Sequence, residues 1–147
     1  MDRELRKEGD KGMKLRKMES PEEIVKILGI EDNVEDYISG DRSAWVQWLM
    51  QQASSEEFRV HIWGVYEEGL LGYMVVVDNR FPPLSEDFYI LYVSNLALKN
   101  YKELSEQVFD ELKELGCKKL SAITVYPDIL EKYGFQREQK VLMSKEL

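Results

Sequence analysis

The feature that most constrains the fold is a strand, helix and strand succession in the second half of the chain. Residues 88–98 form a long apolar run, and residues 101–115 carry apolar side chains at helical spacing. Gly116 ends that helix, and residues 120–126 form a second apolar run. A crossover of this kind joins parallel strands with a right-handed connection. The sequence therefore predicts an α/β fold with one parallel strand pair.

A hairpin is predicted before this unit. Residues 58–66 and 70–77 are rich in β-branched and aromatic side chains, and the turn residues Glu67, Glu68 and Gly69 join them. Both runs are apolar on their two alternating faces, so we expect central strands with helices on both sides.

Helices are predicted on the N-terminal side of the hairpin. After a short strand from Met13, the residues Ser20, Pro21 and Glu23 are typical of a capped helix start, and this helix extends through Leu28. Residues 33–40 predict a short helix, and Asp41 caps another. After the crossover, we expect a short helix over residues 127–133 and a last strand over residues 139–143.

The helix capped by Asp41 places Trp45, Trp48 and Leu49 on one stripe. Two interpretations stay open. The tryptophans can fasten the helix to the sheet, or they can line a groove for a ligand or partner. Phe81, in a loop with Pro82 and Pro83, can likewise present an apolar group to a partner or fold over the sheet edge.

Composition excludes several classes of function. The 147 residues carry a formal net charge of −8, which opposes binding to nucleic acids and anionic lipids. No apolar run is long enough for a membrane helix. One cysteine and one histidine cannot form an internal disulfide or a Cys/His metal cluster, so we expect no metal and a cytoplasmic location. Residues 1–12 predict a disordered tail, and residues 13–147 a single domain.

The order of elements resembles the GCN5-related N-acetyltransferase (GNAT) fold. The phrases that carry the resemblance are MKLRKMESPEE, LLGYMVVVD, Leu96-Ala97-Leu98, ELKELGCKKL, EKYGF and LMSKEL. The resemblance covers residues 13–147. It implies a mixed, mostly antiparallel central sheet with helices on both faces and one parallel crossover, and acetyl-CoA as the cofactor.

The usual acetyl-CoA loop of this family is missing from the sequence. Family members hold the pyrophosphate with an Arg/Gln-x-x-Gly-x-Gly/Ala loop at the start of the crossover helix. Here Lys99 and Asn100 alone separate Leu98 from the helix, and Asn100 with Glu103 forms a capping box. By position, the candidate cofactor-binding residues are those flanking this junction: Leu96, Leu98, Lys99, Asn100 and Lys102.

The catalytic positions of the family are also altered. The resemblance places Leu130 where members carry the tyrosine that protonates the leaving thiolate. Tyr126 is the candidate to replace this tyrosine as the proton donor, whereas Tyr133 is predicted to be an aromatic residue of the core. Glu86 and Asp87 are the candidates for a general base by analogy.

Two functions remain open on the sequence. The chain can be a GNAT-like protein that has lost or altered acetyl-CoA binding and acts by binding a protein or small ligand. Alternatively, it is a divergent acetyl-CoA-dependent N-acyltransferase that acts on an amine. The sequence names neither the partner nor the oligomeric state.

Overall fold

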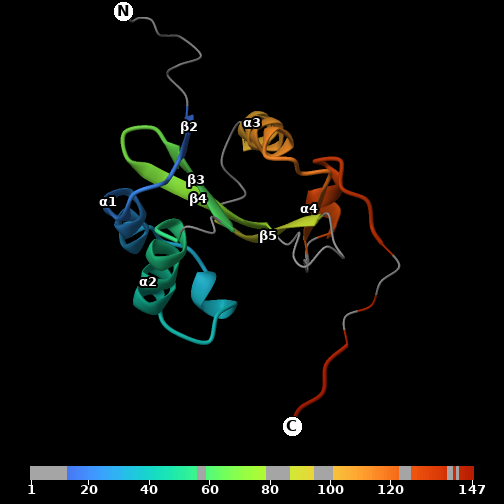
Figure 1. Cartoon of the computed structure of the whole chain (residues 1–147), viewed down its shortest axis with the longest axis horizontal. Coiled ribbons are helices and arrows are strands. Elements are labelled where there is room, and N and C mark those ends of the chain that lie inside the picture. The colour runs from blue at the N-terminus through green and yellow to red at the C-terminus, as the bar shows by residue number, and fades with distance from the viewer. Residues whose placement is uncertain are drawn as a thin grey trace, which may run out of the picture.

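The computed structural model describes residues 13–55, 59–78, 87–94, 101–122, 127–138, 141 and 143–147. The tail predicted at residues 1–12 lies outside this part. In chain order the elements are β2 (Lys14–Lys17), α1 (Pro21–Ile24), the 3₁₀ helices η2 (Val25–Gly29) and η3 (Val34–Asp36), α2 (Arg42–Ala53), β3 (Val60–Tyr66), β4 (Leu70–Asp78), β5 (Asp87–Val93), α3 (Tyr101–Glu114), β6 (Lys119–Ala122) and α4 (Pro127–Glu131) (Figure 1).

The described strands form one sheet in the order β2-β3-β4-β5-β6. Neighbouring strands from β2 to β5 pair antiparallel. The last pair, β5 with β6, is parallel, and α3 connects its two strands. The prediction of a mostly antiparallel sheet with one parallel crossover is confirmed.

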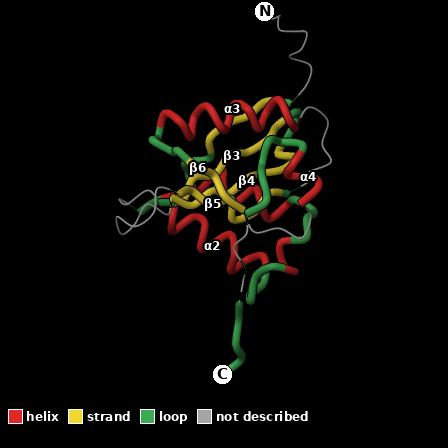
Figure 2. The backbone as a smooth tube through the Cα atoms, turned by 90° about the vertical axis from the view of Figure 1, so that its right-hand side faces the viewer, coloured by secondary structure: helices red, strands yellow, loops and turns green. Residues whose placement is uncertain are grey.

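Helices cover both faces of the sheet, with α2 on one side and α3 on the other (Figures 1 and 2). Under α2, the buried side chains include Trp45, Leu49, Ile62 and Tyr73. Under α3 the larger members of the core are Trp63, Met74, Phe88, Val108 and Leu112. The hairpin is apolar on both faces because alternate residues of β3 and β4 enter different cores, one under α2 and one under α3.

The predicted helix starts are confirmed at two caps. The Ser20 hydroxyl accepts a bond from the Glu23 amide at 3.3 Å, and Asp41 Oδ1 accepts from the Ala44 amide at 2.9 Å. The first helix is shorter than predicted, because α1 ends at Ile24 and the chain continues as the 3₁₀ helix η2. Residues 33–40 likewise contain only the short η3.

The crossover helix ends as predicted. Gly116 adopts φ 94°, a conformation that glycine tolerates best, and the Cys117 amide donates to the Leu112 carbonyl at 2.9 Å. Leu104, Val108 and Leu112 are buried against the sheet, whereas Leu115, predicted on the same stripe, is 39% exposed. The stripe therefore ends one turn earlier than the sequence pattern indicates.

The last predicted strand is not observed in its described residues. Val141 and Met143 belong to no strand and are 79% and 86% exposed. The sequence has the alternation of a strand, but a strand also needs a neighbour, and the tail runs away from the sheet (Figures 1 and 2). None of the helices in the described part of the chain is long and apolar enough to cross a membrane.

Candidate functional site

Strand β5 contains a bulge next to the parallel pair. In the ladder with β4, Val76 faces Ile90 and Val75 faces Tyr92, so Leu91 is an extra residue in β5. The Leu91 side chain is 48% exposed. A bulge of one residue reverses the faces of all following side chains. Ile90 therefore packs in the core under α3, whereas Tyr92 packs in the core under α2.

The same bulge lies at the end of the described pairing between β5 and β6. That ladder runs from Asp87 opposite Lys119 to Ile90 opposite Ala122. Beyond it, the Ser94 amide donates to the Tyr73 carbonyl at 2.9 Å, and the Tyr73 amide donates to the Ser94 hydroxyl at 2.8 Å. The end of β5 is thus held by β4.

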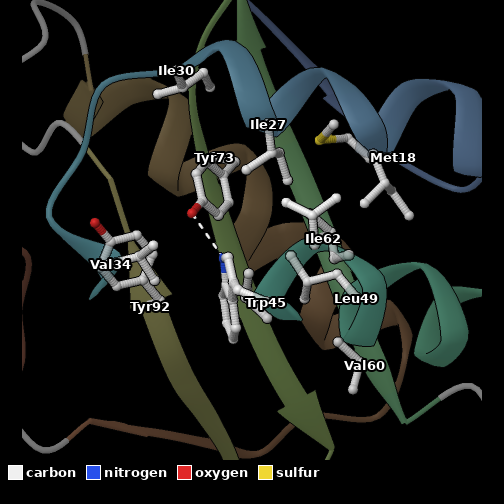
Figure 3. Packing of buried hydrophobic residues seen from close by; sticks show 13 residues of the cluster. Met18, Ile27, Ile30, Val34, Trp45, Leu49, Val60, Ile62, Tyr73 and Tyr92 are labelled. Atoms are coloured by element: carbon white, nitrogen blue, oxygen red, sulfur yellow. Dashed lines mark hydrogen bonds between the residues drawn. The ribbon is translucent and has the colours of Figure 1, made fainter. Parts of the chain in front are cut away.

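Tyr92 and Tyr73 meet a polar group from the segment between η2 and α2. Trp45 Nε1 donates to the Tyr73 hydroxyl at 3.0 Å (Figure 3), and the Tyr92 hydroxyl donates to Asn33 Oδ1 at 2.6 Å. The two tyrosine rings are 5.6 Å apart. Their hydroxyls lie at the edge of the core, where the segment after η2 crosses the sheet.

A buried ion pair stands beside these hydroxyls. Arg42 Nη2 lies 2.7 Å from Asp32 Oδ1, and the Asp32 side chain is only 1% exposed. Asp32 Oδ1 also accepts from the Val34 amide at 3.0 Å. Among the described residues, neither Asp32 Oδ2 nor Arg42 Nη1 has a hydrogen-bond partner, although both atoms are buried. We call Asp32, Arg42, Tyr73 and Tyr92 the tyrosine–carboxylate cluster.

The electrostatics of this cluster follow from burial and from the Asp32 charge. Burial raises the pKa of Tyr73 far above its ordinary value, and the Asp32 carboxylate adds to the rise against the opposing effect of the Trp45 N–H. Burial and Asp32 also raise the pKa of Tyr92 to about 12. Both phenols therefore stay protonated, and the Tyr92 hydroxyl can donate its proton to Asn33 Oδ1. The bond to Asp32 raises the pKa of Arg42, which keeps its charge.

Aromatic rings extend the cluster to the molecular surface. Trp48 stacks on Trp45 with ring centres 5.7 Å apart, and Tyr37 lies 6.0 Å from Tyr92. Trp48 is 36% exposed and Tyr37 is 56% exposed, whereas Trp45 is buried. Trp45 thus fastens α2 to the sheet, as the first interpretation of the tryptophan stripe predicted. Trp48 remains at the surface, and its role in binding a ligand or partner stays a prediction.

A second polar group lies in the core under α3. Lys17 Nζ is 3.0 Å from His61 Nδ1 and 5.0 Å from the centre of the Trp63 ring. Trp63 Nε1 donates to Glu111 Oε1 at 3.2 Å. Burial lowers the pKa of Lys17, against the attraction of Glu19 and Glu111. His61 is only 9% exposed.

The structure places only part of the predicted site. Asp87 begins β5 opposite Lys119, and Lys102 lies in the first turn of α3, but their side chains are outside the described part. Tyr133, predicted as a core aromatic, is half-buried just after α4. The remaining predicted residues lie outside the described ranges: Phe81, Glu86, Leu96, Leu98, Lys99, Asn100 and Tyr126. Their roles stay predictions.

The tyrosine–carboxylate cluster escaped the sequence reasoning. Its members are separated along the chain, and no spacing motif joins Asp32 or Arg42 to the two strands. One signal was available, because residues 31–41 contain five carboxylates, Glu31, Asp32, Glu35, Asp36 and Asp41, and no lysine or arginine. Among the described residues, no group of histidine, cysteine or carboxylate side chains is arranged to hold a metal ion.

The comparisons with known proteins identify the fold. No protein-family model matches the sequence, and no curated protein matches it. Solved structures do. A GCN5-related N-acetyltransferase from Ralstonia eutropha JMP134 gives a TM-score of 0.68 at 14% identity, over 92% of this chain and 99% of that chain. The aminoglycoside 6'-N-acetyltransferase AAC(6')-Ih from Acinetobacter baumannii gives 0.67 at 12% identity, over 92% and 99%.

A third similar structure contains acetyl-CoA. It is a predicted acetyltransferase from Clostridium acetobutylicum, with a TM-score of 0.64 at 15% identity, over 90% of this chain and 96% of that chain. The chain therefore has the GNAT fold, as its sequence predicted. Identities this low define the fold alone.

Proposed function

We propose that this chain binds a small cationic ligand beside the tyrosine–carboxylate cluster and that its acetyl-CoA binding is lost or strongly altered. The sequence between β5 and α3 carries the second half of the proposal. Residues 95–100, NLALKN, contain no glycine and no arginine. A pyrophosphate needs free backbone amides at a helix start, which a glycine-rich loop exposes.

The expected loss of affinity is large. A charge-assisted hydrogen bond contributes about 1.5–3 kcal/mol, so two or three missing pyrophosphate contacts lower the binding free energy by about 4–8 kcal/mol. This corresponds to a factor of about a thousand or more in the dissociation constant. Acetyl-CoA would therefore bind too weakly to act as a cofactor unless other contacts replaced the missing pyrophosphate contacts.

The cationic character of the ligand is inferred from the surface around the cluster. Residues 31–41 carry five carboxylates and no lysine or arginine, and the next residue, Arg42, is already paired with Asp32. The exposed rings of Tyr37 and Trp48 offer faces that attract an ammonium group. The buried acceptor Asp32 Oδ2 has no hydrogen-bond partner within the described chain, so a ligand donor that reached it would reduce the free-energy cost of burying this oxygen.

Calorimetry tests the cofactor half of the proposal. Acetyl-CoA and CoA are titrated into the purified protein, and we expect no saturable binding up to about millimolar ligand. Saturable micromolar binding would overturn this half. Asn100→Gly with Glu103→Gly removes the predicted capping box, and we expect CoA affinity to rise or to appear. Glu106→Gly with Glu114→Gly is the matched control, with two glycines elsewhere in α3.

Tryptophan fluorescence tests the ligand half. Butylammonium is titrated at constant ionic strength, and butyrate serves as an anion of the same size. We expect saturable quenching by butylammonium alone, and a larger dissociation constant in Trp48→Ala, which removes the partly exposed ring that stacks on Trp45. Equal responses to the two ions, or an unchanged titration of Trp48→Ala, would contradict the proposed site.

A divergent N-acyltransferase is the second candidate, and the bulge at Leu91 favours it. The bulge interrupts the ladder of β5 beside the parallel pair, where exposed peptide groups can bind an extended acyl carrier. In this case acetyl-CoA loses its acetyl group to an amine, and the thiolate takes a proton to give free CoA. Amine-dependent release of CoA thiol, measured in Cys117→Ser to remove the protein's own cysteine, would favour this candidate over the first.

A further inference from the structure

We propose that Lys17 and His61 form a reactive pair of an amine and an imidazole, which takes up small uncharged aldehydes as a reversible imine on Lys17 Nζ. The pair lies in the core under α3, whereas Tyr73 and Tyr92 of the tyrosine–carboxylate cluster lie in the core under α2. The inference therefore does not depend on the proposed function.

Strand pairing places the Lys17 side chain beside the His61 ring. Lys17 is the last residue of β2 and stands opposite Trp63 in the antiparallel ladder, where opposite side chains share a face. His61 lies two residues before Trp63 in β3, so its ring is on that face too. Lys17 Nζ accordingly lies 3.0 Å from His61 Nδ1 and 5.0 Å from the centre of the Trp63 ring.

The aromatic side chains of the core hold the imidazole in place. The centre of the His61 ring is 6.1 Å from that of Trp63 and 6.2 Å from that of Phe88. His61 is almost fully buried, whereas Lys17 is only half-buried, so part of the lysine side chain is open to solvent. The pair thus combines a partly accessible amine with a fixed neighbouring base.

The distance between the two nitrogens is that of a nucleophile and its base. Two cations would repel each other at 3.0 Å, so a charged Lys17 requires a neutral His61. A neutral imidazole can accept the proton that an ammonium group must lose before it attacks a carbonyl carbon. Burial also lowers the pKa of Lys17, against the attraction of Glu19 and Glu111, and this increases the share of neutral amine.

The imine forms without any further reactant. His61 takes a proton from the Lys17 ammonium group, and the neutral amine forms a C–N bond to the carbonyl carbon while the carbonyl π pair moves to oxygen. Over the whole step, two protons pass from the nitrogen to this oxygen by way of His61, and the oxygen leaves as water. The nitrogen keeps one proton, so the product is a positively charged iminium.

The surroundings of the amine indicate the class of electrophile. An iminium retains the positive charge at Nζ, which the face of the Trp63 ring and the carboxylates of Glu19 and Glu111 favour. Acylation of the same nitrogen would remove this charge. The two carboxylates also repel an anionic aldehyde, and the half-buried position of Lys17 favours a short one. A small uncharged aldehyde therefore fits the site.

Trapping of the imine with borohydride tests the proposal. The full chain is equilibrated with propanal at neutral pH and reduced rapidly, and tandem mass spectrometry measures propylation at each lysine. We expect propylation at Lys17 to exceed that at Lys14, an exposed lysine in the same strand, by about tenfold or more. Glyoxylate, an anionic aldehyde, should show no such preference. Equal or lower propylation at Lys17 would overturn the proposal, and an equal preference with glyoxylate would overturn the assigned class of ligand.

His61→Gln tests the role of the imidazole, because it removes the base and keeps a polar side chain. We expect the imine at Lys17 to form at least about tenfold more slowly, with the rate at Lys14 unchanged. An unchanged rate at Lys17 would overturn the role of His61. Circular dichroism verifies that the variant is folded. Wild-type protein unfolded in urea provides a second test that needs no variant, because the preference for Lys17 should vanish there, and a preference that persisted would contradict its origin in the fold.

Discussion

Ile90 and Tyr92 are two residues apart in β5, yet their side chains enter opposite cores. Ile90 packs under α3, and Tyr92 packs under α2 beside Tyr73. In a regular strand they would share a face. The extra residue Leu91 between them reverses the alternation of side chains along β5. The Tyr92 hydroxyl therefore lies on the side of the sheet where the charge of the buried Asp32 acts on it.

Deleting Leu91 should therefore destabilise the protein far more than truncating its side chain. Without the bulge, Tyr92 is directed to the wrong core and loses its burial and its hydrogen bond, which lowers the free energy of unfolding by about 2–4 kcal/mol. Leu91→Ala is the control, and its exposed side chain should change stability by less than about 0.5 kcal/mol. Urea unfolding measures both, and equal effects would refute the role of the bulge.

Tyr92→Phe should weaken the contact between β5 and the segment after η2. The substitution removes the bond of 2.6 Å to Asn33 while keeping the ring, so we expect a loss of about 1 kcal/mol in unfolding free energy. Tyr37→Phe removes an exposed phenol on the same surface and should have a much smaller effect. Thermal unfolding of both variants is the measurement. Equal stabilities of the two variants would show that the hydrogen bond between Tyr92 and Asn33 does not stabilise the protein.

Arg42→Met should be strongly destabilising because it leaves the buried Asp32 carboxylate without its cation. Removing one partner of a buried pair costs about 3–5 kcal/mol. Removing the charge of Asp32 as well, in Asp32→Asn with Arg42→Met, should recover part of the loss. Denaturant unfolding measures all three proteins.

An exposed pair provides the control for this experiment. Arg137 binds Asp128 and Glu131 at 2.9 Å each, but its side chain is 60% exposed. Arg137→Met should lower the unfolding free energy far less than Arg42→Met does, because water screens the exposed pair. Similar losses of unfolding free energy in the Arg42 and Arg137 variants would contradict the stronger contribution of the buried Asp32–Arg42 pair.

Lys17 should make stability depend on pH in the alkaline range. Burial lowers the pKa of Lys17 below the ordinary value of a lysine, so the unfolded chain binds more protons than the folded chain between the two pKa values. The unfolding free energy contributed by this group must then rise with pH in that window. Lys17→Met should abolish the rise, and Lys14→Met, an exposed change in the same strand, should retain it. Denaturant midpoints between pH 7 and 11 provide the comparison.

The sequence predicted the parts of the fold that local patterns specify. The hairpin follows from two apolar runs around Glu67 and Gly69, and the α2 start follows from Asp41. The parallel pair follows from the strand, helix and strand order, because crossover connections leave few alternatives. These signals act over a few residues or along one element.

Local sequence patterns could not predict the bulge in β5 or the tyrosine–carboxylate cluster. Residues 88–93, FYILYV, are apolar throughout, so no change of period marks Leu91 as the extra residue. Asp32 is buried only because a distant arginine and two strands surround it in space. The last strand was predicted from its own alternation, but Val141 and Met143 have no neighbouring strand in the described chain to complete it.

The edge strand β2 limits the assemblies that the described sheet permits. β2, at the edge of the described sheet opposite β6, is four residues long and has the sequence Lys14-Leu15-Arg16-Lys17, with Lys14 and Arg16 exposed. A fibril grows only if each added copy offers a fresh edge for the next. The positive charges of β2 repel a second copy of the same strand and therefore disfavour growth from this edge.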